Sequence, residues 1–211
     1  MVGEGVLHVC LQDPRVETVL IINRHPLGLT HPKLKEIIHK DFYDLSPIAN
    51  ELTGYNACFF CLGITSVGIA ADDYYKITYT LTMHVAGILS RNNPDMVFCY
   101  VSGGGTDSTE KGRIRWARVK GKTENDLMKL PFRHVYAFRP GFIKPIPGLS
   151  HTHSFYKYIN WLFPIGRSLY STAFCTMQEL GLAMIRVADP SVPFTTGAIV
   201  TGKDIIRLGG S

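Results

Sequence analysis

The sequence predicts an α/β fold with a parallel sheet that is covered by helices on both faces. Short apolar segments alternate along the chain with longer amphipathic segments, which is the pattern of strands that are connected by helices. Most of the apolar segments are nearly continuous, as expected for strands that are buried on both faces. At 211 residues, with 45% hydrophobic and 18% charged residues, the chain fits a single domain that spans 1–211.

The predicted strands are short runs that end at a polar residue or a glycine. The first runs from Thr18 to Asn23 and consists mainly of β-branched and aliphatic residues. Another ends immediately before Gly63, and a third ends at Ser102. We expect strands at 18–23, 36–40, 56–62, 96–102, 134–138 and 198–200.

The predicted helices are the amphipathic segments between these strands. Ser46 suits the N-cap and Pro47 suits the first helical position, so these two residues predict a helix over 46–52. The stretch 142–190 is expected to contribute a helical region on the substrate side of the domain. We expect helices at 1–11, 46–52, 72–91, 110–129, 155–170, 176–188 and 204–208.

The charge and hydropathy patterns indicate which partners to expect. The net charge of +5 is modest, and the basic stretch 111–122 fits a solvated helix face better than a nucleic-acid surface. The apolar, aromatic stretch 155–175 is interrupted by Lys157, Pro164 and Arg167, which favours a pocket or lid, or contact with a membrane surface, over a transmembrane helix. We therefore expect no nucleic-acid partner and no transmembrane segment.

The cysteines and histidines indicate the compartment and argue against a metal site. Five cysteines lie mostly within apolar runs, which suits a reducing compartment, and no signal peptide is visible. Cys58 and Cys61 have C-x-x-C spacing, but side chains three apart on a strand face opposite ways. His151 and His153 have no evident third ligand. We therefore expect a cytoplasmic protein without a metal ion.

Polar residues and glycines gather at the ends of the predicted strands. In an open parallel sheet, ligands bind at the carboxyl ends of the strands. The sequence therefore predicts a binding site at this edge of the sheet. The residues at these positions are Arg24, Asp41, Leu62, Gly63, Ser102, Pro140 and Gly141.

The segments around these residues resemble a known family. The most telling segments are 13–16, 23–24, 39–42, 61–63, 100–103, 118–121 and 139–141. Together they resemble the atypical short-chain dehydrogenase/reductases, and among these the bacterial and fungal relatives of the human Tat-interacting oxidoreductase-like protein. The resemblance covers nearly the whole chain. It implies a Rossmann-like, NAD(P)-binding fold and hydride transfer between a nicotinamide and a small carbonyl or alcohol.

The resemblance implies NADP, rather than NAD, as the cofactor. Arg24, just past the strand 18–23, would contact the 2′-phosphate, because a guanidinium suits a phosphate group and no acidic residue stands there. The other implied contacts are Gly3 at the phosphate-binding turn, Asp41 and Phe42 at the adenine, Leu62, Gly63 and Lys120 at the nicotinamide ribose, and Pro140 and Gly141 at the carboxamide.

Ser102 and Lys120 resemble two catalytic residues of the family, whereas Trp116 stands where the family has a tyrosine. In that family the tyrosine hydroxyl is the general acid and base. An indole N–H is a donor only, so Trp116 does not replace it as a proton carrier. Tyr79 and Tyr100 are candidate substitutes, although the sequence places neither hydroxyl at the site. Otherwise a water molecule or another side chain would carry the proton.

The resemblance also implies that the first strand and most of the glycine-rich turn of the fold are missing. In the strand order 3-2-1-4-5-6 the first strand is central, so its absence leaves a gap and exposes two strand edges. Gly3 would be the last glycine of the turn. The alternative is that the segment 197–202 fills the gap.

Three functions follow from these observations. The first is an atypical NADP-dependent oxidoreductase-like protein for an unknown small carbonyl or alcohol, with activity retained, reduced or lost. The second is a non-catalytic, nucleotide-sensing regulator or scaffold with a protein partner. The third is a fragment that binds no cofactor. Consumption of NADPH that depends on a substrate distinguishes the first from the second.

Overall fold

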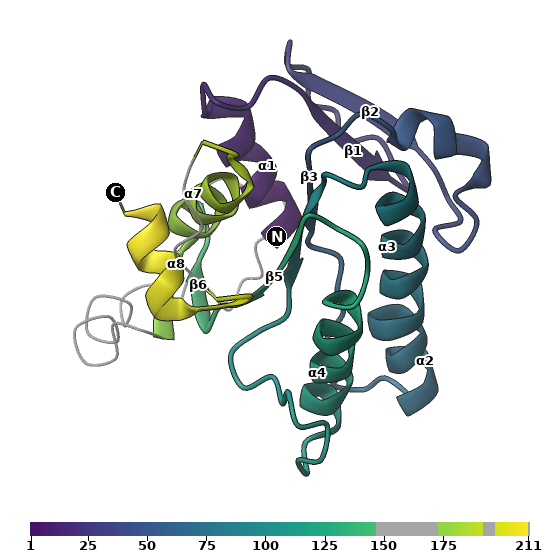
Figure 1. The fold of residues 1–211 in the computed structure, drawn as a ribbon, viewed down its shortest axis with the longest axis vertical. Helices are drawn as coiled ribbons and strands as arrows, with labels where there is room; N and C mark the ends of the chain where they lie inside the picture. The colour runs from purple at the N-terminus through teal and green to yellow at the C-terminus, as the bar shows by residue number, and fades with distance from the viewer. Residues whose placement is uncertain (147–172, 192–196, 211) are drawn as a thin grey trace.

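The computed structural model describes residues 1–146, 173–191 and 197–210. These residues form an α/β fold in which parallel strands lie between two groups of helices (Figure 1). The predicted fold class is therefore confirmed. The predicted helix over 155–170 lies outside the described residues, so only the two flanks of the region 142–190 are described.

The main sheet consists of four parallel strands in the order β3-β4-β5-β8. Strand β4 has a partner on each edge, because it pairs with β3 and with β5. Phe98 and Cys99 in β4 are completely buried, so this strand is the centre of the fold. The four strands are β3 (Ala57–Phe60), β4 (Val97–Val101), β5 (His134–Arg139) and β8 (Ile199–Thr201).

Two further strand pairs lie outside the main sheet. Strand β1 (Val19–Asn23) pairs in parallel with β2 (Leu34–Ile38). Strand β6 (Phe142–Lys144) pairs with β7 (Phe174–Thr176), and neither of these short strands is predicted from the sequence. Strand β8 pairs with β5 at the end of the main sheet, so the alternative in which 197–202 fills a central gap is wrong.

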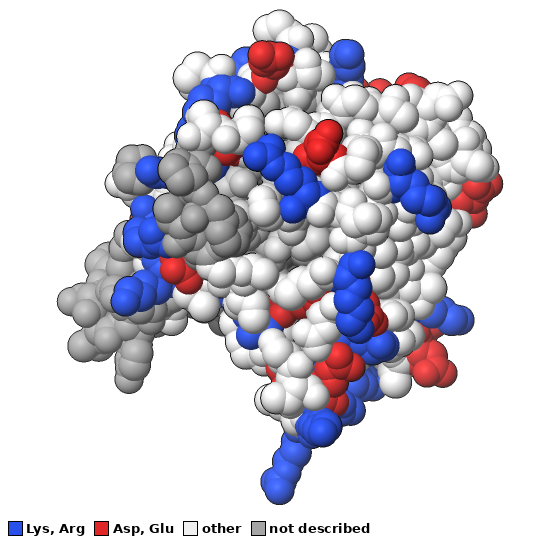
Figure 2. All heavy atoms as spheres, in the orientation of Figure 1, with Lys and Arg blue, Asp and Glu red and all other residues white. Residues whose placement is uncertain are grey.

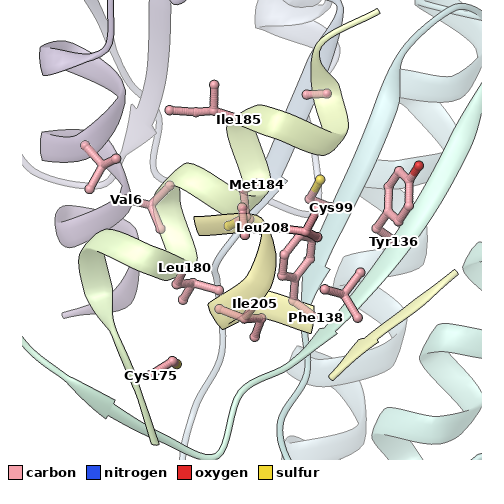
Figure 3. Packing of buried hydrophobic residues seen from close by; sticks show 14 of the residues in the cluster. Val6, Cys99, Tyr136, Phe138, Cys175, Leu180, Met184, Ile185, Ile205 and Leu208 are labelled. Carbon is pink, nitrogen blue, oxygen red and sulfur yellow. The ribbon is translucent and has the colours of Figure 1, made fainter. Parts of the chain in front are cut away.

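Helices α1 (Val2–Gln12), α7 (Met177–Ala188) and α8 (Gly202–Gly209) cover one face of the main sheet. Figure 3 shows Leu180 and Met184 of α7 among the apolar side chains of this face. The start of α7 is fixed by a capping box, in which the Thr176 hydroxyl accepts from the Glu179 N–H at 3.1 Å and the Glu179 carboxylate accepts from the Thr176 N–H at 2.7 Å. The apolar side chains that are buried on this face form the first core cluster, which includes Val6, Val9, Val97, Cys99, Phe138, Leu180, Met184, Val200 and Ile205.

Helices α2 (Ala71–Tyr75), α3 (Leu81–Asn92) and α4 (Arg115–Leu127) and the 3-10 helix η1 (Ser46–Leu52) lie on the other face. The second core cluster fills this face and includes Leu45, Leu52, Phe60, Leu81, Leu89, Phe98, Tyr100 and Leu127. The rings of Phe60 and Phe98 stack with their centroids 5.8 Å apart. Each face of the sheet therefore has its own apolar core.

Three of the predicted helices differ in detail from the structure. Ser46 is not the N-cap of its helix, because Leu45 holds that position and the Ser46 hydroxyl donates to the Asp44 carboxylate instead. Helix α4 begins at Arg115 rather than 110, because the preceding residues turn around the Asp107 carboxylate, which accepts from the Gly112 N–H at 2.7 Å. The helix predicted over 72–91 contains a π-helical turn, η2 (Lys76–Thr80), between α2 and α3.

The distribution of surface charge and the lengths of the helices concern the two kinds of partner considered above, nucleic acids and membranes. Figure 2 shows Lys and Arg side chains scattered among acidic and uncharged residues on the visible face. Within the described ranges, no helix combines the length and the apolarity that are needed to cross a membrane.

Gly121 and Gly87 offer a matched test of helix packing. Both lie in helices, but a Cβ on Gly121 would lie 1.8 Å from the carbonyl oxygen of Asp107, whereas the nearest atom to a Cβ on Gly87 is 3.7 Å away, in the Arg91 side chain. We expect Gly121→Ala to lower the free energy of unfolding by about 1–3 kcal/mol through overpacking. We expect Gly87→Ala to raise it by about 1 kcal/mol through helix propensity. Urea denaturation measures both changes, and equal changes would contradict the close packing of α4 on this turn.

Candidate functional site

The candidate residues follow the carboxyl ends of five parallel strands. Arg24 directly follows β1, Ser102 directly follows β4, and Pro140 directly follows β5. Asp41 lies just beyond β2, and Leu62 and Gly63 lie just beyond β3. Because the strands of each sheet are parallel, these residues lie at the carboxyl edge, as the sequence predicts.

Ser102 is buried, and its polar groups are bonded within the protein. Its backbone N–H donates to the carbonyl oxygen of Phe138 at 2.8 Å, and its hydroxyl donates to the same oxygen at 3.1 Å. The ammonium group of Lys120 donates to the carbonyl oxygen of Ser102. Burial lowers the pKa of Lys120, while the nearby Glu124 acts in the opposite direction. The structure therefore brings together the two residues that the sequence pairs as catalytic.

Trp116 lies one helical turn before Lys120 and packs against the glycine-rich loop. A Cβ on Gly105 would lie 3.5 Å from the Cη2 atom of the indole. Gly103 and Gly105 have φ values of +146° and +89°, which only glycine adopts without strain. The position that the resemblance assigns to a tyrosine holds an indole, whose N–H group donates a hydrogen bond but does not act as a general acid or base.

The same loop also contacts the end of β5. The N–H of Gly104 donates to the carbonyl oxygen of Pro140 at 2.6 Å. A Cβ on Gly141 would lie 2.3 Å from the carbonyl oxygen of Ala173, so the close approach of the chain there requires a glycine. The loops after β4 and β5 thus form one continuous surface beside Ser102.

Neither candidate substitute for the missing tyrosine offers a free hydroxyl at this surface. Tyr100 is 2% exposed and belongs to the second core cluster, and burial raises the pKa of its hydroxyl. The Tyr79 hydroxyl donates to the Asp126 carboxylate at 2.8 Å, and the Lys122 ammonium lies 4.9 Å from the Tyr79 ring centroid. Both side chains serve packing and surface contacts.

A buried ion pair that the sequence analysis missed joins α4 to β5. The guanidinium of Arg139 donates to both carboxylate oxygens of Glu124, with Nε at 3.1 and 3.2 Å, and also to the Ser108 hydroxyl. The Glu124 side chain is 1% exposed and that of Arg139 is 16% exposed. The signal in the sequence is the spacing of Glu124, four residues after Lys120 and therefore on the same face of the helix.

The start of α1 lies beside the carboxyl end of β3. A Cβ on Gly3 would lie 3.5 Å from the Cβ of Cys61, and Leu62 follows with 37% of its surface exposed. A Cβ on Gly63 would meet nothing within 4 Å. The N-cap residue Met1 makes no side-chain capping bond. Helix N-termini are common binding sites for anions, and this one lies at the carboxyl edge of the sheet.

The ends of β1 and β2 hold the residues that the resemblance assigns to the adenosine part of the cofactor. Arg24 is exposed, and its guanidinium makes no hydrogen bond or ion pair with any described residue. The Asp41 carboxylate accepts from the Tyr43 N–H at 2.9 Å, so it also stabilises a turn. Phe42 is half-buried and packs against the second core cluster.

The described residues contain no group of three or more His, Cys, Asp or Glu side chains that could hold a metal ion. Cys58 and Cys61 are free thiols, and burial raises the pKa of each to about 12. His151 and His153 lie outside the described residues.

The candidates thus fall into two groups at the carboxyl edge. Hydrogen bonds and packing link the group around β4 and β5, which comprises Ser102, Trp116, Lys120, Pro140 and Gly141. The ends of β1, β2 and β3 carry the second group, which comprises Gly3, Arg24, Asp41, Phe42, Leu62 and Gly63.

The second group and Lys120 together fit a phosphate-bearing dinucleotide. Arg24 offers a guanidinium that has no partner among the described residues, and the start of α1 lies beside the carboxyl end of β3. Lys120 has three N–H donors, of which one is directed at Ser102. Guanidinium groups and helix N-termini both suit phosphate oxygens, and an ammonium group suits the hydroxyls of a ribose.

No protein-family model matches the chain. Two curated fungal proteins align with nearly all of it. The protein fmp52, mitochondrial, of Aspergillus clavatus is 28% identical over 226 residues, which cover 100% of this chain and 94% of that protein. The protein FMP52, mitochondrial, of Saccharomyces cerevisiae is 24% identical over 99% of this chain and 92% of that protein.

Solved structures confirm the Rossmann-like fold. A short chain dehydrogenase family protein from Francisella tularensis has a TM-score of 0.62 and 16% identity, over 96% of this chain and 93% of that chain. The Bordetella bronchiseptica enzyme WbmH, solved in complex with NAD+, has a TM-score of 0.60 and 16% identity, over 90% of this chain and 68% of that chain. The narrower resemblance to relatives of the human Tat-interacting protein stays a prediction.

The expectation of a cytoplasmic protein is wrong, because both fungal relatives are named as mitochondrial proteins. The expectation rested on free, buried thiols and on the lack of a visible secretory signal. These features distinguish a reducing compartment from an oxidising one. They do not distinguish the cytosol from the interior of a mitochondrion.

The ion pair between Glu124 and Arg139 gives a stability test of the site. Arg139→Met leaves the Glu124 carboxylate buried without its cation, so we expect the free energy of unfolding to fall by about 3–5 kcal/mol at pH 7.

The controls for this test are a second variant and a surface ion pair. Glu124→Met combined with Arg139→Met removes both charges and should recover most of the lost stability. Lys129 forms an ion pair with Asp126 on the surface, and its side chain is 74% exposed. Lys129→Met should therefore change the free energy of unfolding by less than about 1 kcal/mol. Urea denaturation at pH 7 measures all three variants, and a loss of stability in Arg139→Met no larger than that in Lys129→Met would contradict the buried pair.

Proposed function

We propose that this protein binds a nicotinamide dinucleotide at the carboxyl edge of its sheet and is an atypical, NADP-preferring oxidoreductase-like protein. The observation that carries the proposal is the hydrogen bond from the Lys120 ammonium group to the carbonyl oxygen of Ser102. This bond lies at the end of the central strand of a Rossmann-like fold. The solved neighbour WbmH, which is complexed with NAD+, supports a nicotinamide cofactor for this kind of fold. The preference for NADP rests on Arg24.

Each of these residues would contact a different part of the cofactor. The Arg24 guanidinium would hold the 2′-phosphate, and the N-terminus of α1 at Gly3 would face the pyrophosphate. Lys120 would donate to the hydroxyls of the nicotinamide ribose. Asp41 and Phe42 would lie against the adenine. The remaining contacts, at the ribose and the carboxamide, would come from Leu62, Gly63, Pro140 and Gly141.

The substrate would be a small carbonyl compound or alcohol beside Ser102. When bound, the nicotinamide supplies the chemistry of hydride donation or acceptance. The Ser102 hydroxyl donates to the Phe138 carbonyl oxygen, so its own oxygen is left to accept from the hydroxyl of an alcohol. A carbonyl substrate requires this hydroxyl to turn away from Phe138. The proton would then pass through water or through Lys120, the titratable group that touches Ser102.

A second function, nucleotide sensing without turnover, is favoured by two specific observations. Trp116 occupies the position of the proton-carrying tyrosine, and the Ser102 hydroxyl is already bonded within the protein. In that case nucleotide binding would alter a surface that a protein partner reads. Tight binding of NADPH without consumption, over a panel of small carbonyl compounds, supports this second function. Consumption that depends on a carbonyl supports the first.

We also propose a mitochondrial location, which rests on the names of the fungal relatives. Imaging of the tagged chain in cells with a mitochondrial marker tests it. Uniform staining of the cytosol would contradict the proposal.

Titration with NADPH and then with NADH tests the cofactor and the role of Arg24. The chain has two tryptophans, so Trp161→Phe serves as the background and leaves Trp116 as the reporter. We expect saturable quenching by NADPH. Arg24→Gln should lower the affinity for NADPH by roughly 10- to 100-fold, because it removes charge-assisted hydrogen bonds of about 1.5–3 kcal/mol. The affinity for NADH should not change. Arg133→Gln, just before the amino end of β5, is the matched control, and an equal loss in both variants would contradict selection by Arg24.

Trp116→Tyr tests whether the site lacks only a proton carrier. We expect carbonyl-dependent NADPH oxidation to rise by roughly 10²- to 10⁴-fold, because a positioned general acid contributes about that factor. Trp116→Phe is the matched control, since it keeps an aromatic ring without a hydroxyl. If the tyrosine variant binds NADPH but gains no turnover with any carbonyl that the protein binds, the oxidoreductase proposal fails and the sensing function remains.

A further inference from the structure

His39 lies where the two strands of the β1–β2 pair end. Its backbone N–H donates to the carbonyl oxygen of Asn23 at 2.8 Å, so it extends the strand pairing by one residue beyond β2. Asn23 is the last residue of β1, and Arg24 follows it directly. The backbone of His39 therefore fixes the end of β2 beside the residue to which the resemblance assigns the 2′-phosphate.

The side chain of His39 binds the turn that follows β2. Its Nε2 atom lies 2.7 Å from the carbonyl oxygen of Asp41 and 2.6 Å from that of Asp44. Carbonyl oxygens only accept, so Nε2 carries the proton and donates to both. The Asp41 carbonyl oxygen also accepts from the Asp44 N–H at 3.1 Å, which closes the turn. One imidazole thus holds both ends of the turn 41–44.

The other hydrogen bonds of this turn are local. The Asp41 carboxylate accepts from the Tyr43 N–H through Oδ1 at 2.9 Å, and the Asp44 carboxylate accepts from the N–H and the hydroxyl of Ser46. Asp41 and Asp44 are both exposed, so burial does not hold them in place. Within the described ranges, the bonds from the half-buried His39 ring are the side-chain bonds that tie the turn back to the end of β2.

The turn carries the two residues that the proposed function places against the adenine. The Oδ2 atom of Asp41 has no hydrogen-bond partner in the described part of the chain, so it is left to accept from a ligand. Adenine offers a suitable donor in its exocyclic amino group. The Phe42 ring meets the His39 ring edge to face, with the centroids 6.3 Å apart. The imidazole therefore contacts both of the residues whose positions matter for the adenine.

We propose that His39 is a positioning residue for the adenine end of the cofactor site, because its Nε2–H group holds the turn 41–44 in the form that presents Asp41 and Phe42. The inference rests on the proposed function. A turn that is already ordered loses less conformational freedom when a ligand binds, so the hydrogen bonds of His39 raise the affinity for adenine nucleotides. The effect applies to NADPH and NADH alike, since both carry the same adenine. In this respect it differs from the effect of Arg24.

The experiment measures the affinity of the full chain for four ligands by isothermal titration calorimetry: NADPH, NADH, ADP and reduced nicotinamide mononucleotide. His39→Phe keeps an aromatic ring but loses the donor. We expect its affinity for NADPH, NADH and ADP to fall by roughly 5- to 20-fold, the effect of one or two neutral hydrogen bonds. Reduced nicotinamide mononucleotide has no adenine, so its affinity should not change.

Two further variants separate the donor from the ring. His39→Gln retains a side-chain N–H donor, so it should recover most of the affinity for ADP. His31→Phe is the matched control, because the His31 ring accepts from the Lys33 N–H at 3.2 Å just before β2 begins. This control loses a similar bond to the backbone at the other end of the strand, and it should bind all four ligands as the unmodified chain does.

Amide hydrogen exchange without nucleotide examines the turn itself. The amides of Tyr43 and Asp44 should exchange several-fold faster in His39→Phe than in the unmodified chain, because the turn opens more readily. The amides of β4 should exchange at the same rate in both, which shows that the variant is folded.

The inference is overturned if folded His39→Phe binds ADP as tightly as the unmodified chain. It is also overturned if reduced nicotinamide mononucleotide loses affinity together with ADP, because His39 then acts on the whole fold, or if His39→Gln recovers no affinity. An unmodified chain that binds neither NADPH nor NADH contradicts the proposed function, and the inference fails with it. An unmodified chain that binds both, with the same affinities in His39→Phe, contradicts this inference alone.

Discussion

The burial of β4 is the constraint on which the rest of this structure depends. The strand has a partner on each edge, and its residues alternate between the two cores, with Val97 and Cys99 in the first and Phe98 and Tyr100 in the second. Such a strand has little freedom to shift its register, because a shift by one residue exchanges the faces. Ser102 directly follows β4, and both its N–H and its hydroxyl donate to one carbonyl oxygen of β5. The position of Ser102 therefore follows from the packing of the sheet.

Helix α4 is held against this edge by charged groups rather than by apolar contacts alone. Lys120 reaches the carbonyl oxygen of Ser102, and Glu124, one turn later, binds Arg139 at the end of β5. Removing these charges from water costs free energy, and the attraction between them offsets this cost only when the charged groups are close and well aligned. The same helical face therefore positions Lys120 and leaves Trp116, one turn earlier, against the glycine-rich loop. These contacts join α4 to the ends of β4 and β5.

The periodicity of apolar residues predicted most of the helices and strands, because this periodicity reflects which face of each element is buried. The apolar runs correctly placed β1, β3, β4, β5 and β8, and the glycines and polar residues marked their carboxyl ends. The strands β6 and β7 were missed, because each has three residues and its partner is distant in sequence. The π-helical turn at Lys76–Thr80 has no local signal of its own. The Glu124–Arg139 pair was missed because a single charge on a helix predicts exposure unless its partner is known.

The candidate site rests on strands that are held in two different ways. Ser102 and Pro140 follow β4 and β5, each of which has a hydrogen-bonded neighbour on both edges. Arg24 and Leu62 follow β1 and β3, each of which has one such neighbour among the described residues. Backbone segments with fewer protected hydrogen bonds open at a lower free energy than segments in the middle of a sheet. The backbone that leads to Ser102 and Pro140 is therefore held by more strand pairing than the backbone that leads to Arg24 and Leu62, and the proposed cofactor site spans both parts.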